Sequence, residues 1–547
     1  MRITFVGLGW EQLGIGLLSA LAKGEGHKVD LAFSSALFND RYNFNISALA
    51  ALLNDKKDVL SAIKKQRPDV IAFSPITSTY QWMLDIAKES KSIFPDIKVI
   101  FGGVHASILQ EKVLLNDHID YVCIGEGDAA FIEILRSIER KSCHKPIVNT
   151  LYRPQSHENI IRGTQQAFIQ DLDSLPIFDK VIWEDHMRLS DIYFTMASRG
   201  CPFHCTYCFN SFFATLSDCK PGNYVRHRSV EHVIYELKIA KARYSPKIIE
   251  FEDDVFTINK KWLKDFLYHY KKEINIPFQC LSHPTCMDED IVIWLKEGGC
   301  SHVQLGIQSM DENYKKTVIK RYDKNIHVER ALISMQKHGI LPKVDHMFGL
   351  PNEPLSAQET ARELYAKYTP YRIQTFWTNF FPGTEMTLQA LADKAISPQE
   401  FDIINEGRSA DFYRRSRIED PKKLKTYKAY ELIFKLLPVI PKGYRHKLKP
   451  KLFLMLPNWI CSSITFLIDV LVGLTTKNPD HIAYARYYQY HIVKFVLTKL
   501  NIKIPGATKI LDPKSFDLNF RKPVKSGSII KTRPRTAPTI PGIEVLK

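Results

Sequence analysis

The sequence is poor in cysteine, and its overall composition is not strongly biased. Only 10 of its 547 residues are cysteine, and most of them stand alone within apolar runs, which is typical of buried thiols and argues against a secreted disulfide framework. Hydrophobic residues make up 45% of the chain and charged residues 24%, so neither a fibrous nor a disordered protein is indicated. The sequence contains no internal repeat of the kind that would predict a solenoid. We therefore expect a globular, cytoplasmic protein of roughly three or four domain-sized units.

Over most of its length the chain also lacks an excess of positive charge. Residues 421–547 hold 24 Lys and Arg against 6 Asp and Glu, a net charge of +18, whereas residues 1–420 have a net charge of −2. Basic clusters of the C-terminal region, such as KKLK and RHKLKPK, could contact phosphates. No nucleic-acid recognition module is recognisable there. We expect no nucleic-acid partner, and a non-catalytic metal- or nucleic-acid-binding protein is the alternative to an enzyme.

An uninterrupted membrane-spanning run is missing as well. The N-terminal stretch MRITFVGLGWEQLG is broken by Glu11 and predicts a strand and turn rather than a signal peptide. The most apolar segment, residues 452–476, is long enough to span a bilayer, but Pro457 and Asp469 interrupt it. Its flanking lysines and Trp459 are typical of a segment at a membrane interface, and a buried helical hairpin explains the same pattern. A peripheral membrane contact is therefore one of two interpretations.

The chain does contain two series of alternating strands and helices. The first, in residues 1–140, predicts a doubly wound parallel-sheet α/β domain. Its strands are expected at residues 2–8, 28–33, 69–74, 98–103 and 120–127. They end in the small and polar stretches GLG, SPITST, GGVHAS and GEGD. Because ligands bind outside the carboxyl ends of parallel strands, these stretches predict a site for a large ligand, although tight turns alone would also explain the glycines.

The second series fills residues 193–390, after a connecting segment at 141–192. Its strands are expected at residues 192–198, 247–253, 277–282, 302–307, 343–348 and 372–377. Six strand–helix units predict a partial (βα)6 barrel, smaller than a full eight-fold barrel. Residues 391–513 predict a mainly helical, basic and apolar C-terminal domain. Residues 514–547 are rich in Pro, Lys and Arg, and predict a disordered tail.

Three of the ten cysteines are concentrated in the stretch SRGCPFHCTYCFN, directly after the first strand of the predicted barrel. Cys201, Cys205 and Cys208 have the spacing C-x3-C-x2-C and fall in a loop on the face where such barrels carry active sites. Structural zinc needs four ligands, commonly in two spaced pairs, and no second C-x2-C follows. His204 or Cys219 could supply a fourth ligand, and Cys219 could complete a ferredoxin-type cluster. The remaining interpretation is a 4Fe–4S cluster with three protein ligands and one open iron.

This motif, with aromatic Tyr207 before its last cysteine, resembles that of the radical S-adenosylmethionine superfamily. The resemblance implies that Cys201, Cys205 and Cys208 hold a 4Fe–4S cluster whose open iron binds S-adenosylmethionine. It also implies a flavodoxin- or ferredoxin-like electron donor, whose electron cleaves the cofactor to a 5′-deoxyadenosyl radical.

Further segments resemble the family in the expected order. EFEDDVFT resembles the acidic second-strand segment of the cobalamin-dependent branch, which places Asp253 and Asp254 near the cofactor ribose or the substrate. QLGIQSMDENYKKTVIKR resembles the fourth-strand stretch, and HMFGLPNEP and FFPGTEM resemble the later GLP and PGT segments. The residues that this resemblance places at S-adenosylmethionine are Tyr207, Asp253, Gly306, Gln308, Ser309 and, for its carboxylate, Arg321. Where the family often has arginine after the third strand, this chain has His283.

The N-terminal domain then resembles the cobalamin-binding domain of the largest radical subclass. The contacts that the resemblance implies for the nucleotide tail are Ser74, Thr77, Gly102, Gly103, His105, Gly125, Glu126 and Gly127. The signature D-x-H-x-x-G, whose histidine ligates cobalt in other cobalamin proteins, is absent. The resemblance therefore implies a cobalt without a histidine on its lower face, or a domain that has lost cobalamin.

The resemblance covers about residues 1–390 and implies methylation of an unactivated carbon by a radical mechanism. Radical cyclisation or rearrangement without methyl transfer shares every motif and stays an alternative. The apolar, basic C-terminal segment suggests a small hydrophobic substrate, such as a lipid or an isoprenoid.

Overall fold

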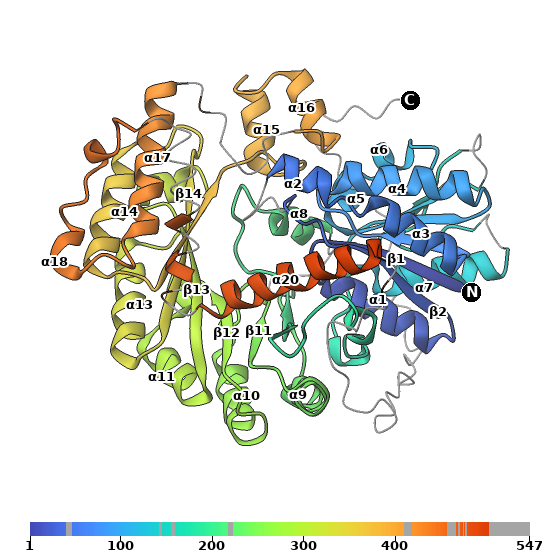
Figure 1. Cartoon of the computed structure of the whole chain (residues 1–547), viewed down its shortest axis with the longest axis horizontal. Helices are drawn as coiled ribbons and strands as arrows, with labels where there is room; N and C mark the ends of the chain where they lie inside the picture. The colour runs from blue at the N-terminus through green and yellow to red at the C-terminus, as the bar shows by residue number, and fades with distance from the viewer. Residues whose placement is uncertain are drawn as a thin grey trace.

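The computed structural model describes residues 1–39, 46–141, 145–154, 159–216, 223–409, 418, 420–456, 467–468, 471–473, 475, 478–500 and 502. Two α/β units lie side by side, and helices of the C-terminal region pack around them (Figure 1). A single hydrophobic core cluster includes residues of both units, so they are packed together and not merely tethered.

The N-terminal sheet has five parallel strands, as predicted, in the order β2-β1-β3-β4-β5. These are β1 (Arg2–Leu8), β2 (Lys28–Ser34), β3 (Val70–Phe73), β4 (Lys98–Phe101) and β5 (Tyr121–Cys123). The helices between and after them are α1 (Leu13–Gly24), α2 (Ser47–Leu52), α3 (Lys56–Gln66), α4 (Tyr80–Ile93), α5 (Gly103–Leu109), α6 (Glu111–Leu114) and α7 (Gly127–Glu139). The core strands are continuous apolar runs because helices bury both faces of a parallel sheet.

The segment 141–192 is more than the connection that the sequence predicts. It adds β6 (Thr150–Tyr152) and β7 (Ile161–Arg162), which pair antiparallel and extend the sheet to seven strands. Tyr152 is fully buried and stacks on Tyr121 with ring centroids 5.3 Å apart. This packing covers the edge that β5 would otherwise expose.

The second unit is a six-stranded, all-parallel sheet that confirms the predicted partial barrel. Its strands, in chain order, are β8 (Ile192–Thr195), β11 (Ile248–Phe251), β12 (Phe278–Ser282), β13 (Cys300–Gln308), β14 (Leu341–Phe348) and β15 (Arg372–Trp377). The outer helices are α9 (Val230–Tyr244), α10 (Lys260–Glu273), α11 (Glu289–Gly298), α13 (Asn325–His338) and α14 (Ser356–Lys367). The first and last strands, β8 and β15, do not pair with each other, so the barrel is open along one side.

Shorter elements decorate the barrel. They are the antiparallel ribbon β9 (Ser198–Arg199) and β10 (Arg226–His227), with α8 (Phe209–Leu216) and α12 (Glu312–Thr317). The C-terminal region is helical, with α15 (Glu385–Ala392), α16 (Pro398–Asn405), α17 (Pro421–Leu436), α18 (Lys442–Arg445) and α20 (Pro479–Lys499). The predicted tail 514–547 lies outside the described residues.

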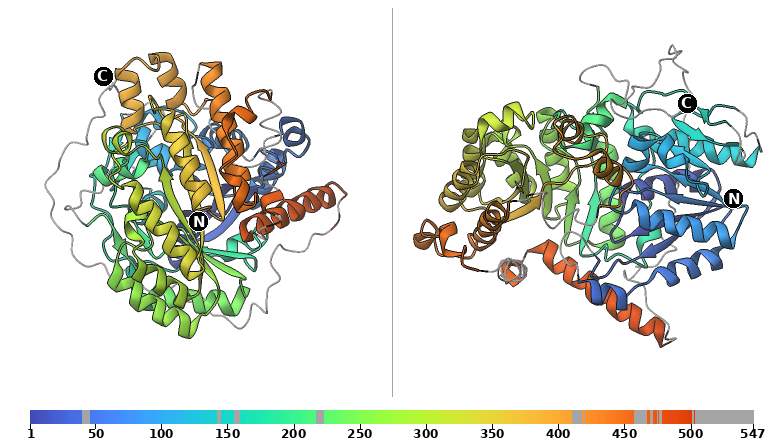
Figure 2. Two further views of the ribbon diagram at one scale, coloured as in Figure 1. Left: turned by 90° about the vertical axis from the view of Figure 1, so that its left-hand side faces the viewer. Right: turned by 90° about the horizontal axis from the view of Figure 1, so that it is seen from above.

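Helix α20 joins the two units. Its N-terminal Asp480 accepts hydrogen bonds inside the barrel from Gln279, at 2.8 Å, and from Lys343. About two turns later, Tyr487 donates to the backbone oxygen of Ser35 in the N-terminal unit at 3.0 Å. Figures 1 and 2 show α20 running from the barrel across to the N-terminal sheet. Among the described residues no helix is both long and apolar enough to cross a membrane.

Candidate cofactor site

The cysteine motif occupies the loop between β9 and α8. It begins at Gly200, whose φ of +91° favours glycine and where a Cβ would lie 2.3 Å from the backbone oxygen of Tyr224. Its last turn is closed by the Cys208 N–H, which donates to the Cys205 oxygen at 3.1 Å. The Ser211 hydroxyl donates to the same oxygen at 2.8 Å. These two hydrogen bonds tie the end of the motif to the first turn of α8.

Two of the three motif thiols are hard to ionise in the protein alone. Burial raises the pKa of Cys201 and of Cys208 to about 12, and the neighbouring Asp254 and motif thiols act in the same direction. No group of three His, Cys, Asp or Glu side chains in the described part of the chain is arranged to hold a single metal ion. A cluster of four irons spreads its ligands over separate atoms and stabilises thiolates directly. Three thiols are a donor set that such a cluster can use, and Cys219 lies outside the described residues.

Arg321 connects the cysteine loop to the fourth barrel strand that was expected to contact the cofactor. Its guanidinium is almost fully buried and donates to the Gly306 oxygen at 2.6 Å, to the Tyr207 hydroxyl at 3.4 Å and to Asp323 at 3.1 Å. Burial alone would raise the pKa of Asp323, but the hydrogen bond from His283 and the charges of Arg321 and Lys315 hold it well below its usual range. Arg321 is thus a buried, permanently charged group at the mouth of the barrel.

His283 takes a definite place in this network. Its Nε2 lies 3.4 Å from an Asp323 oxygen, and its ring stacks on Phe203 of the cysteine loop with centroids 4.0 Å apart. The histidine that replaces the family's frequent arginine therefore supports the carboxylate behind Arg321.

The other predicted contacts on β13 separate into two groups. Gly306 and Gln308 are half-buried, and Gln308 has a φ of +68° at an irregular point of the strand. A Cβ at Gly306 would lie 2.8 Å from the Gln308 amide nitrogen, so the glycine leaves room for that side chain. Ser309 is fully buried and donates to Glu353, which places its hydroxyl behind the mouth.

Asp253 and Asp254 face different ways. Asp253 is buried and accepts hydrogen bonds from the Ala197 N–H, at 3.0 Å, and from the Ser198 hydroxyl. Burial raises its pKa to about 6. Asp254 is exposed, accepts from Asn210 at 2.8 Å and lines a cavity beside the cysteine loop. Asp253 therefore braces the loop, while Asp254 is the carboxylate that a ligand can reach.

That cavity, of about 410 Å³, lies between the two units. On the N-terminal side it is lined by the strand ends, among them Ser74, Gly102, Gly103, Gly125, Glu126 and Gly127. On the barrel side it is lined by Ser198, Arg199, Gly200, Asn210, Glu252 and Asp254. Apolar side chains from β1, α1 and α7 form its floor. A glycine rim with an apolar floor fits a flat base on a nucleotide tail, and the wall on the barrel side includes residues that flank the cysteines, Gly200 before them and Phe209 and Asn210 after them.

Two predicted tail contacts do not line the cavity. His105 is fully buried, its Nδ1 lies 3.2 Å from the Thr77 hydroxyl, and its ring lies on Tyr80 with centroids 4.1 Å apart. Burial lowers the pKa of His105 to about 3, so the ring is neutral. His105 and Thr77 therefore tie α5 to the β3 loop.

Ion pairs that the sequence did not indicate cross the cavity wall. Arg226 donates to both oxygens of Glu126 at 2.7 and 2.9 Å, and Arg199 donates to Asp128 at 2.6 Å. Both arginines belong to the β9–β10 ribbon, whereas both carboxylates belong to the loop and helix after β5. Glu126 is thus engaged by arginine at the cavity. The signal available in the sequence was only that Arg199 adjoins the cysteine motif.

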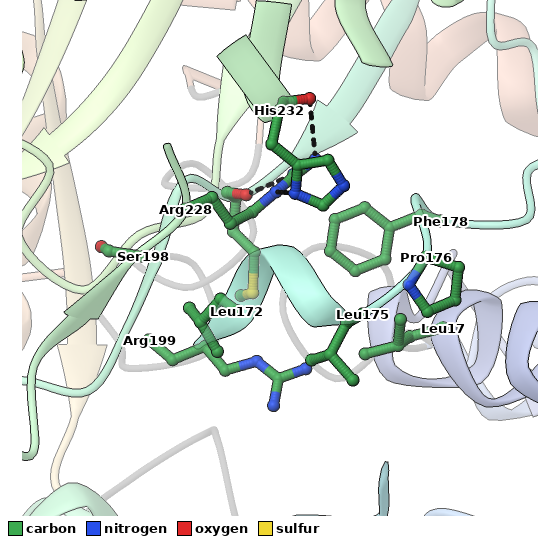
Figure 3. A pocket seen from close by; sticks show the side chains of 10 residues that line it. Leu17, Leu172, Leu175, Pro176, Phe178, Ser198, Arg199, Arg228 and His232 are labelled. Carbon is green, nitrogen blue, oxygen red and sulfur yellow. Dashed lines mark hydrogen bonds between the residues drawn. The ribbon is translucent and has the colours of Figure 1, made fainter. Parts of the chain in front are cut away.

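A second cavity lies beside these ion pairs, but it is too small for a cofactor. It has a volume of about 20 Å³ and is lined by residues such as Leu172, Phe178, Arg228 and His232 (Figure 3). The His232 Nδ1 lies 3.1 Å from Asp173. A volume of this size holds about one water molecule.

Comparison with known proteins agrees with this geometry. A model of the B12-binding domain matches residues 3–135, and a model of the radical SAM superfamily matches residues 196–364. The chain is similar to an uncharacterised methyltransferase of Pyrococcus horikoshii, at 28% identity over 68% of this chain and 80% of the relative. It is also similar to the cytidylyl-2-hydroxyethylphosphonate methyltransferase of Streptomyces wedmorensis, at 22% identity over 71% and 79% of the two chains.

Solved structures show the same arrangement of units. The radical enzyme OxsB, determined with aqua-cobalamin bound, superposes with a TM-score of 0.59 at 12% identity, over 92% of this chain and 82% of that one. The methyltransferase TsrM from Kitasatospora setae, determined with cobalamin and a 4Fe–4S cluster, superposes with a TM-score of 0.55 at 15% identity, over 73% and 79% of the chains. At such identities the likeness shows the fold. With both family models matched in order and the cysteine motif facing the glycine-rich sheet edge, the chain belongs to the cobalamin-dependent radical S-adenosylmethionine enzymes.

Proposed function

We propose that the protein methylates an unactivated carbon of a small molecule. The observation that carries this proposal is that the glycine-rich sheet edge and the cysteine loop line one cavity. When bound, the cluster and S-adenosylmethionine supply a 5′-deoxyadenosyl radical that removes hydrogen from carbon, and cobalamin supplies the methyl group.

The protein's own residues hold and orient these groups. Cys201, Cys205 and Cys208 would hold the cluster, and Arg321 presents a buried positive charge next to Gly306 that suits a carboxylate. Tyr207 and Gln308 complete that side of the barrel mouth, and Ser309 lies behind it. The sheet-edge residues Ser74, Gly102, Gly103, Gly125, Glu126 and Gly127 would receive the nucleotide tail, with Thr77 and His105 supporting the loop beneath them. Hydrogen abstraction by a carbon radical needs no general base, so we assign none.

Radical cyclisation without methyl transfer is a second candidate. The anaerobic magnesium-protoporphyrin IX monomethyl ester cyclase of Rubrivivax gelatinosus is 23% identical to the chain over 70% of this chain and 67% of the relative. Methylation is favoured because the similar proteins of Pyrococcus horikoshii and Streptomyces wedmorensis are named as methyltransferases.

The finer aspects of the proposal concern substrate and partners. We propose a hydrophobic substrate such as a lipid or an isoprenoid, a flavodoxin- or ferredoxin-like electron donor, and a cytoplasmic location with peripheral membrane contact. The relative named hopanoid C-3 methylase, from Methylococcus capsulatus, is 26% identical over 47% of the chain and acts on a compound of that hydrophobic kind.

The test is anaerobic purification followed by measurement of iron, sulfide and corrinoid. We expect an absorption spectrum with both cluster and corrinoid bands. With reductant and S-adenosylmethionine carrying a labelled methyl group, we expect 5′-deoxyadenosine and label on the corrinoid. Methylated product formed without 5′-deoxyadenosine would contradict the radical mechanism, and 5′-deoxyadenosine without any methyl transfer would favour the cyclase.

A further inference from the structure

The C-terminal helices carry an unusual share of the exposed apolar surface. Seven Leu, Ile, Val or Met side chains in the described part of the chain are more than 55% exposed, and five of them fall between Leu452 and Leu500. These five are Leu452 (63%), Met455 (90%), Leu467 (58%), Leu471 (58%) and Leu500 (62%). Single exposed leucines are ordinary on a protein surface, but such a concentration needs an explanation.

The stretch that leads into this region is basic, and it is free of acids as far as Asp469. Between Glu431 and Asp469 the sequence has six Lys or Arg residues and no Asp or Glu. Five of the six lie within ten residues, at Lys442, Arg445, Lys447, Lys449 and Lys451, in α18 and the turn after it. Tyr444, between them, is 60% exposed. Apolar side chains flanked by cations are what an anionic lipid surface binds, because the headgroups attract the charges and the acyl boundary accepts the apolar groups.

Helix α20 adds a second apolar stretch. Its inner face is committed to the two units through Ala483, Tyr487 and His491, whereas Val493, Val496 and Leu500 are about half-exposed or more, at 50%, 48% and 62%. The spacing of three and four residues puts these three on one face of the helix. In the right-hand view of Figure 2, α18 and α20 lie along the same edge of the molecule, so one flat surface can meet both.

We propose that this C-terminal surface, defined by Tyr444, Leu452, Met455, Val493, Val496 and Leu500 with the five basic residues of 442–451, docks the enzyme on an anionic bilayer. The inference deepens the proposed function, since it names the partner of the membrane contact and the residues that make it. Binding to an anionic bilayer would explain the positive charge of the C-terminal region without a nucleic-acid partner. An interface with a second copy of the chain is the competing occupant; it is disfavoured because the cations of one copy would face those of the other.

The test uses the full-length chain, reconstituted anaerobically, in co-sedimentation with two kinds of vesicle. One kind is phosphatidylcholine mixed with phosphatidylglycerol, and the other is phosphatidylcholine alone. We expect binding to the anionic vesicles that falls as salt is raised, and at least tenfold weaker binding to the neutral ones. Equal binding to both, or none to either, would overturn the proposal.

Two variants and matched controls identify the surface. Lys447→Glu with Lys451→Glu should weaken binding to anionic vesicles by more than tenfold, since each charge near such a surface contributes on the order of fivefold. The control Lys64→Glu with Lys65→Glu makes the same charge change on the exposed side of α3 and should leave binding unchanged. Leu452→Ser with Met455→Ser should weaken binding without altering the salt dependence, whereas Leu52→Ser with Leu115→Ser, two other highly exposed leucines, should not. Equal effects of test and control variants would contradict the assignment.

Light scattering excludes the competing occupant. We expect the wild type and the Leu452→Ser, Met455→Ser variant to have the same molar mass in the absence of vesicles. A dimer that the variant abolishes would mean that this surface meets a second copy. Because vesicle binding is measured without turnover, its failure leaves the cofactor chemistry standing, and absence of a corrinoid or cluster leaves the docking result standing.

Discussion

Replacement of a single motif cysteine distinguishes a cluster ligand from an ordinary buried thiol. Cys201→Ala leaves two thiols, so we expect iron and sulfide to fall to background and 5′-deoxyadenosine formation to be lost. The control is Cys286→Ala, which removes another half-buried free thiol outside the motif and should keep iron, sulfide and cofactor cleavage. The measurement is metal and sulfide content per chain with the visible spectrum. Full retention of iron in Cys201→Ala would show that another residue holds the cluster.

Glu353 makes the stability of the fold depend on pH. Burial raises its pKa from 4.5 to about 7, against the hydrogen bonds from Ser309 and Gln358. Between these two values the folded state binds more protons than the unfolded state, so this group's contribution to the free energy of unfolding decreases as pH rises from about 4.5 to about 7. We expect Glu353→Gln to flatten that decrease in denaturant unfolding measured across the same range.

Asp345 is the control for that measurement, because burial raises its pKa only to about 6. Asp345→Asn should reduce the pH dependence only below about pH 6 and leave the part between about 6 and 7 unchanged. If Glu353→Gln leaves the profile between about 6 and 7 unchanged, the pH dependence near 7 does not come from Glu353.

At the scale of elements, α20 contributes the carboxylate that pairs with a buried lysine of the barrel. Lys343 on β14 is 2% exposed and pairs with Asp480, the second residue of α20. Asp480→Ala leaves the Lys343 charge buried without this partner, and losing one member of a buried pair costs about 3–5 kcal/mol. We expect a lower melting temperature in differential scanning calorimetry and faster proteolysis of α20. Lys343→Met combined with Asp480→Leu should recover most of the loss, and no recovery would mean that α20 docks for another reason.

The helices and strands were largely predictable from the sequence. The direction in which individual side chains point was not. Eleven parallel strands follow from apolar runs with glycine or polar ends, and each is present in the two sheets. The strands β6 and β7 have three and two residues, too few for alternation to show. Neighbouring Asp253 and Asp254 look alike in sequence, yet a strand end turns them to opposite faces. Likewise, whether His105 faces the cavity depends on where α5 begins, and it begins at Gly103.

Ion pairs between residues that are distant in the chain could not be predicted from the sequence either. Asp480 meets a lysine 137 residues earlier, and Arg226 meets a glutamate 100 residues earlier. Lys343, Asp480 and Arg226 stand in no motif, and the GEGD stretch that contains Glu126 carried no signal of its arginine partner. The motif residues, by contrast, are brought to one region because each follows a strand of a parallel sheet, and the carboxyl ends of such strands share an edge.

At the scale of the whole molecule, the N-terminal sheet meets the barrel beside the loop that carries the three motif cysteines. We call this contact the seam. The seam is fastened by Arg226 on Glu126 and by Arg199 on Asp128. Arg226 is 3% exposed in its side chain, and a bidentate pair of this kind fixes orientation as well as distance. Since Arg199 lies two residues before the first motif cysteine, the pairs hold the cluster loop against the glycine-rich rim.

We expect Glu126→Gln to loosen this seam without unfolding either unit. The neutral amide keeps the shape of the side chain but removes the charge opposite the buried Arg226, which weakens the pair by a few kcal/mol. Hydrogen exchange should increase at the β9–β10 ribbon and at the start of α7, and corrinoid per chain should fall several-fold while iron per chain changes little. The control Glu133→Gln removes a carboxylate that pairs with Arg136 on the exposed side of α7 and should change none of these. If Arg226→Gln alone matches the effect and the double variant adds nothing to it, the two residues act as one pair; additive losses would instead mean that Glu126 contacts the cobalamin tail independently.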